Sequence, residues 1–178
     1  MSPILLHEVK GKTEVLTFNT PEKLNVLSEQ MLKELSIALT KSAANHSTCV
    51  VILRSTGKAF CAGHDLKQMQ SARSHQDNGF DYYNKLFDQC SKVMLQIKNL
   101  PKPVIAEVQG VATAAGCQLV ATCDIAVASK IAKFGVNGVN IGLFCSTPMV
   151  ALSRNIGRKK SFEMLVTGDF MTALEAKE

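Results

Sequence analysis

A cysteine, a histidine and an aspartate lie close together in the stretch KAFCAGHDLKQM, residues 58–69. Such residues serve three kinds of chemistry: metal binding, nucleophilic attack by a cysteine, and hydrogen bonding by the backbone of a tight turn. His64 and Asp65 are adjacent, so in a strand they point to opposite faces, and no second ligand pair lies nearby in the sequence. Cys61 has no base and orienting group beside it. A strand-to-helix turn that bends at Gly63 is therefore the favoured interpretation, and no metal site is predicted.

A second turn of this kind is predicted near the middle of the chain. The apolar strand PVIAEVQG, residues 103–110, runs into small residues and then into a helix near AAGCQL. Ala114, Ala115 and Gly116 are small enough for a ligand to approach the backbone, and unpaired N–H groups at a helix N-terminus attract negative charge. Two such turns brought together could direct two N–H groups at one oxygen, which is the arrangement of an oxyanion hole.

Strands and helices alternate around these turns, which predicts one α/β domain over residues 1–178. VATAAG, residues 111–116, is predicted as a loop. A capping box at Thr172–Glu175 begins a last helix, and the chain ends three residues later, so we expect a fragment or a shortened form of a longer protein. Strands are predicted at residues 13–19, 49–55, 103–110 and 125–129, and helices at residues 28–43, 80–100, 117–124, 148–156 and 161–166.

Composition narrows the class of protein. The net charge is +5, and with two tyrosines and no tryptophan the chain offers few stacking surfaces for nucleic acid. No apolar run reaches the ~20 residues of a membrane helix. The six cysteines form no C-x-x-C pair and are typical of buried thiols in a reducing compartment. No targeting segment is recognisable, so we expect a cytoplasmic protein, or a mitochondrial matrix protein from which a transit peptide has been removed.

The two turns belong to a series of motifs that runs along the whole chain. In this order the motifs resemble the crotonase superfamily, the enoyl-CoA hydratase/isomerase proteins. AAGCQLVA and GLFCSTP resemble those of the enoyl-CoA-hydratase-domain-containing proteins. The motifs are FNTPEKLNVLSEQML (18–32), GKAFCAGHDLKQM (57–69), PKPVIAEVQGVATAAGCQLVATCDIAVAS (101–129), AKFGVNGVNIGL (132–143) and EMLVTGDFMTALEAKE (163–178).

The resemblance implies a ClpP/crotonase-like spiral of ββα units, with C-terminal helices that are truncated here. It implies binding of an acyl-CoA thioester and stabilisation of its enolate by the backbone N–H groups of His64 and Ala115. Coenzyme A is part of that substrate, so no separate cofactor is implied. The resemblance also implies a homotrimer or a hexamer, if the native protein has the C-terminal helices through which relatives assemble. The residues implied to line the substrate, besides His64 and Ala115, are Lys23, Leu24, Val26, Ala62, Asp65, Leu66 and Gly138.

The chain departs from the hydratase pattern at both catalytic glutamates. GCEL of the pattern is GCQL here, which puts Gln118 in the first position, and FGxPE is FGVNG, which puts Gly138 in the second. Gln118 can hold a water molecule, but an amide cannot take its proton near neutral pH, so efficient hydration is not expected. Two hypotheses remain: an enzyme that stabilises an enolate, and a catalytically weak acyl-CoA binder with a regulatory role.

Two side chains could act in place of the glutamates. By resemblance, Cys145 occupies the position of a nucleophilic aspartate in relatives that attack an aromatic ring of the acyl group. To act as a nucleophile, the Cys145 thiol would need a lowered pKa. The alternative interpretation is that Cys145 is a buried structural thiol. The imidazole of His64 could be a base near the site, and its alternative is an incidental side chain on the turn. A peptidase on the related spiral fold is disfavoured, because no Ser or Cys occupies the Ala115 turn and no His follows it.

Overall fold

Two sheets form the frame of the molecule, which a computed structural model describes for residues 2–178. The large sheet has five strands in the order β1-β2-β3-β5-β7, parallel except for the β1–β2 hairpin. The small sheet has four strands in the order β4-β6-β8-β9. The strands of the large sheet are β1 (Leu5–Lys10), β2 (Thr13–Phe18), β3 (Val50–Ser55), β5 (Val104–Val108) and β7 (Ile125–Ala128), and those of the small sheet are β4 (Ala59–Cys61), β6 (Val111–Thr113), β8 (Lys133–Gly135) and β9 (Met171–Thr172).

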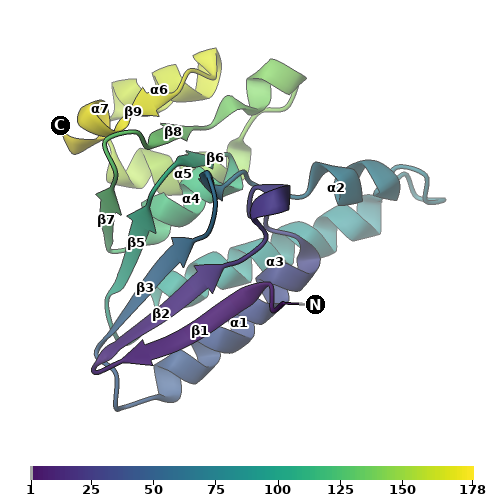
Figure 1. Cartoon of the computed structure of the whole chain (residues 1–178). Coiled ribbons are helices and arrows are strands. Elements are labelled where there is room, and N and C mark those ends of the chain that lie inside the picture. The colour runs from purple at the N-terminus through teal and green to yellow at the C-terminus, as the bar shows by residue number, and fades with distance from the viewer. Residues whose placement is uncertain (1) are drawn as a thin grey trace.

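Helices cover both sheets. Figure 1 shows α1 and α3 side by side behind the large sheet, and α4, α5 and α6 near the small one. The helices are α1 (Glu29–Ala44), α2 (Leu66–Ala72), α3 (Phe80–Lys98), α4 (Ala115–Thr122), α5 (Ser146–Asn155), α6 (Arg158–Thr167), α7 (Ala173–Lys177) and the 3-10 turns η1 (Pro21–Lys23) and η2 (Asn137–Ile141).

The chain repeats one unit as it moves through the fold. One strand joins the large sheet, the next joins the small sheet, and a helix follows: β3–β4–α2, β5–β6–α4 and β7–β8–α5. This confirms the α/β class that the sequence predicts and the spiral of ββα units that the resemblance implies. Because β4 and β6 are parallel neighbours, the turns that follow them lie at the same edge of the small sheet.

The core lies between the sheets and the helices. Met31, Leu35 and Leu39 recur at helical spacing and bury one face of α1 against the large sheet. Phe18 of β2 and Phe60 of β4 are fully buried and meet edge to face at 5.9 Å, so they join the two sheets. Both sheets are therefore held in one core.

The predicted helices and long strands are present, with ends shifted by a few residues. The prediction of a loop over VATAAG is wrong, because Val111–Thr113 form β6 by pairing with β4 and β8, which are distant in sequence. Helix α5 begins at Ser146 and not at Pro148, which sits in its first turn where proline is tolerated. The capping box at Thr172 and Glu175 is confirmed. Over residues 2–178, no helix is both long and apolar enough to cross a membrane.

Candidate functional site

The turns after β4 and β6 lie against each other. Gly63 adopts a left-handed φ of +92°, and a Cβ placed on it would lie 3.0 Å from Cβ of Ala114 and 3.4 Å from N of Ala115. Gly116 is packed as closely, since its added Cβ would overlap the carbonyl oxygen of Cys61. Only glycine permits this approach of strand and helix at both places.

Each turn offers a backbone N–H group without a partner in the described part of the chain. Ala115 is the first residue of α4, so its N–H has no partner within the helix. Within residues 2–178, neither this N–H nor that of His64 donates a hydrogen bond to another group. Both residues line one cavity of about 530 Å³, called the site cavity below.

Apolar and neutral polar side chains surround the site cavity. No Asp, Glu, Lys or Arg is among the described residues that line it. An adjoining cavity of about 780 Å³ shares five of its apolar lining residues and extends along α2 and α3 to Arg73. The shared residues are Leu66, Met69, Phe87, Ile141 and Leu143. An extended apolar group that enters the site cavity therefore has room to continue.

The His64 imidazole is held as a neutral ring. Its Nδ1 lies 3.4 Å from the carbonyl oxygen of Leu27, and the ring meets Phe87 edge to face at 5.5 Å. Burial lowers the pKa of His64, and the Leu27 hydrogen bond opposes this only in part. Nε2 is buried without a partner among the described residues. The ring thus anchors its turn, while its unprotonated Nε2 is enclosed by protein.

The segment before α1 is attached to the His64 turn by backbone hydrogen bonds. Ala62 N donates to Leu24 O at 3.1 Å, and Leu27 N donates to Gly63 O at 2.7 Å. The buried Asn25 holds this segment in place. Its Nδ2 donates to the carbonyls of Thr56 and Ala59, and its Oδ1 accepts from Thr20 N.

None of the motifs in the sequence predicts this role of Asn25. The signal for it is the TPEKLN turn, because asparagine tolerates the left-handed φ of 53° found here and bonds readily to nearby backbone. Its side chain positions residues 23–26 beside the site.

Only some of the predicted substrate residues line the site cavity. Asp65 caps α2 through the N–H groups of Lys67 and Gln68. The cavity lining does not include Lys23, Leu24, Val26 or Asp65. The structure brings into the site cavity Ala62, His64, Leu66, Ala115, Gly138 and Cys145.

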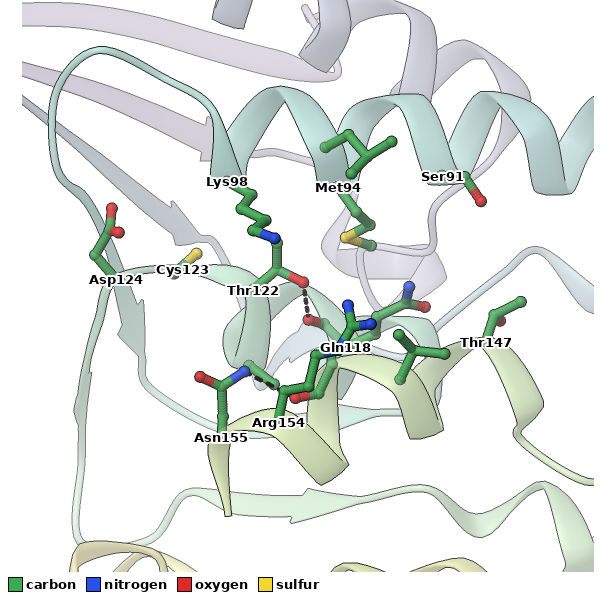
Figure 2. A pocket seen from close by; sticks show the side chains of 14 residues that line it. Ser91, Met94, Lys98, Gln118, Thr122, Cys123, Asp124, Thr147, Arg154 and Asn155 are labelled. Atoms are coloured by element: carbon green, nitrogen blue, oxygen red, sulfur yellow. Dashed lines mark hydrogen bonds between the residues drawn. The ribbon is translucent and has the colours of Figure 1, made fainter.

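Gln118 lies outside this group. It is buried in α4 and lines a separate cavity of about 640 Å³ between α3, α4 and α5 (Figure 2). Lys98 and Arg154 line the same cavity, and its Thr147 also lines the site cavity. Gln118 Oε1 is buried without a partner among the described residues. Gln118 is therefore not among the residues that line the site cavity, although it lies on the same helix as Ala115.

Gly138 and Cys145 contact each other in the wall of the site cavity. A Cβ on Gly138 would lie 2.8 Å from Cys145 Sγ and would overlap the carbonyl oxygen of Leu143. Burial raises the pKa of the Cys145 thiol, although the Gly138 backbone partly opposes this. A nucleophilic cysteine needs the opposite shift. Cys145 is therefore a protonated thiol that packs against the turn.

The backbone of Ala114 is strained in this turn. Its φ of 50° and ψ of −122° belong to a region that glycine adopts far more easily. Ala114→Gly is expected to raise the free energy of unfolding by about 1 kcal/mol, because relief of strain exceeds the entropy gained by the unfolded chain. Urea unfolding measures this. Ala115→Gly, at a helical position, should lower the free energy of unfolding by about 1 kcal/mol. If both variants lost the same stability, Ala114 would not be strained.

The described residues contain no group of three or more His, Cys, Asp or Glu side chains placed to hold a metal ion. The arrangement instead offers two N–H donors at an apolar cavity, on a spiral of ββα units. The spiral of ββα units is the fold of the crotonase proteins. The chain belongs to the enoyl-CoA hydratase/isomerase family, whose sequence profile matches residues 8–178.

Individual relatives agree with this assignment. The chain is 48% identical over 174 residues to the human enoyl-CoA hydratase domain-containing protein 3, mitochondrial, covering 98% of this chain and 55% of that protein. The zebrafish (Danio rerio) protein of the same name is 46% identical over 175 residues, covering 98% and 59%. The chain thus spans little more than half the length of these relatives.

Solved structures show the same fold. A crystal structure of an enoyl-CoA hydratase from Mycobacterium smegmatis superimposes with a TM-score of 0.93 at 55% identity, covering 99% of this chain and 67% of that one. The crystal structure of the human domain-containing protein 3 gives a TM-score of 0.91 at 45% identity, covering 98% and 67%.

Proposed function

We propose that the chain binds an acyl-CoA thioester with its acyl group in the site cavity, and that the N–H groups of His64 and Ala115 stabilise the thioester enolate. The observation that carries this proposal is the pair of unpartnered N–H groups on two adjacent turns that line one cavity. Family membership supports acyl-CoA as the ligand. The apolar wall suits a hydrocarbon chain.

The N–H groups would act where charge develops. Removal of a proton from carbon 2 of the thioester puts negative charge on the thioester oxygen. Backbone donors fixed in advance stabilise this charge without reorganisation, and one such donor is typically worth about 10²–10³ in rate. Gly63 and Gly116 support this role, because they allow the two donors to lie close together.

Efficient hydration of a double bond is not part of the proposal. Addition of water needs a group that activates the water and one that donates a proton. No carboxylate lines the site cavity among the described residues, and Gln118 lines another cavity. The same features favour, as a second candidate function, an acyl-CoA binder with a regulatory role.

Exchange of the protons on carbon 2 of butyryl-CoA in deuterated water, followed by mass spectrometry, tests enolate stabilisation. The protein is expected to accelerate exchange, and Ala115→Pro should reduce the acceleration by about 10²–10³. Proline removes this N–H, and helices tolerate proline at their first residue. Thermal unfolding checks that the variant is folded. Tight binding without acceleration would favour the regulatory binder, and no binding of butyryl-CoA would contradict both functions.

Crotonyl-CoA tests the expectation about hydration. The hydrated product, detected by its mass, should form no faster with the unmodified protein than with Gln118→Ala. Turnover well above that of Gln118→Ala would contradict the carboxylate argument, since it would show that an amide-held water suffices.

The two expected locations are not equally supported. The human and zebrafish relatives are named as mitochondrial proteins. This supports the mitochondrial matrix, which we propose, while the cytoplasmic expectation has no such support.

A further inference from the structure

Thr113 and Asn137 lie side by side next to the turn that carries Ala115. Thr113 ends β6 and pairs with Gly135 of β8, and Asn137 begins η2 two residues after Gly135. Thr113 Oγ1 donates a hydrogen bond to Asn137 Oδ1 at 2.5 Å. Both residues line the site cavity. Neighbouring strands thus place an asparagine amide near the proposed enolate donors.

The hydrogen bond from Thr113 determines how the amide is oriented. Because Oδ1 accepts from the hydroxyl, the Nδ2 amino group is the end of the amide that remains available. Within residues 2–178, Nδ2 donates to no other group. Asn137 is half-buried. It therefore presents a fixed, neutral hydrogen-bond donor in a cavity that no charged Asp, Glu, Lys or Arg side chain lines.

The residue that holds this donor is near Ala115 in the chain, and Asn137 and Ala115 line the same cavity. Thr113 precedes Ala115 by two residues, so their Cα atoms lie at most about 7 Å apart. In a 3-oxoacyl thioester the second carbonyl is separated from the first by a single carbon. Two hydrogen-bonding positions near each other in one apolar cavity match such a pair of oxygens.

We propose that Asn137 is a specificity-determining residue, whose Nδ2 group donates a hydrogen bond to the oxygen on carbon 3 of a 3-oxoacyl-CoA ligand. This inference rests on the proposed function, since it assumes that His64 and Ala115 hold the thioester oxygen. Loss of the proton from carbon 2 to the buffer leaves an electron pair that spreads over both oxygens. The third donor then stabilises the share of charge on the second oxygen, and hydrogen bonds to charged acceptors are the stronger ones.

Acetoacetyl-CoA and butyryl-CoA test the proposal, because they have equal chain length and differ by the oxygen on carbon 3. Calorimetry should show acetoacetyl-CoA binding about tenfold more tightly to the unmodified protein, the contribution of one hydrogen bond to a charged acceptor. Asn137→Leu should reduce the preference to about twofold or less and change the dissociation constant of butyryl-CoA by less than about threefold. The ultraviolet band of the bound acetoacetyl-CoA enolate should weaken in the same variant.

Two further variants distinguish loss of the Asn137 donor from a general disturbance of the cavity. Asn137→Asp keeps an acceptor for Thr113 but replaces the donor with a carboxylate oxygen, so it should reverse the preference in favour of butyryl-CoA. Asn84→Leu, on the exposed side of α3, should keep the preference of the unmodified protein.

A preference that survives in Asn137→Leu and Asn137→Asp would overturn the role of Asn137. Equal binding of both ligands by the unmodified protein would also overturn it, while leaving the proposed function intact. If the unmodified protein bound neither ligand, the proposed function would fail as well.

Discussion

Gly116→Ala is expected to lower the free energy of unfolding by about 3 kcal/mol or more and to abolish acyl-CoA binding. The new Cβ would overlap the carbonyl oxygen of Cys61 and would lie 2.8 Å from Cys61 Cβ. Cys61 ends β4, which is fixed by its pairing with β6, so the strand cannot move aside without breaking the small sheet. Separation of β4 from α4 would pull apart the turns of His64 and Ala115. Urea unfolding and butyryl-CoA calorimetry measure the two effects.

Gly157→Ala is the matched control for this prediction. Gly157 precedes α6, and a Cβ placed on it meets nothing within 4 Å. This substitution should lower the free energy of unfolding by about 1 kcal/mol or less, because alanine is a weaker helix cap than glycine. Acyl-CoA binding should be unchanged. Similar losses of stability in the two variants would show that close packing at Gly116 is not the cause.

Restoring both glutamates of the hydratase pattern is expected to fail. Gly138→Glu should lower the free energy of unfolding by about 4 kcal/mol, because its Cβ would overlap the Leu143 carbonyl and its carboxylate would be buried without a cation. The double variant Gln118→Glu/Gly138→Glu should therefore gain no hydration of crotonyl-CoA. Urea unfolding and product mass are the measurements.

Asn140→Glu provides the comparison for stability. Asn140 lies on the same turn as Gly138 but is exposed, so its carboxylate stays in water and the change should remain within about 0.5 kcal/mol. A double variant that folds stably and hydrates crotonyl-CoA would show that the turn can open, and that the missing side chains alone limit hydration.

Much of the fold follows from patterns that are local in sequence. The apolar run of β3 and the helical spacing of α1 and α3 each specify a buried face, and the box at Thr172 specifies a helix start. The small strands were harder to predict. Val111–Thr113 are only three residues long and become a strand by pairing with β4 and β8, which no local pattern records.

The candidate site shows the same division. The sequence by itself determined that Gly63 and Ala114–Gly116 form turns of small residues with backbone N–H groups to offer, and that glutamates are missing at positions 118 and 138. Only the tertiary structure decided that parallel pairing of β4 with β6 brings these turns together. It also decided that packing of α3 and α5 around α4 places Gln118 in a different cavity, and that Thr113 fixes the amide of Asn137. The physical reason is that these placements depend on contacts between segments far apart in the chain. Sequence motifs and hydrophobic periodicity report only on residues that are close together in the chain.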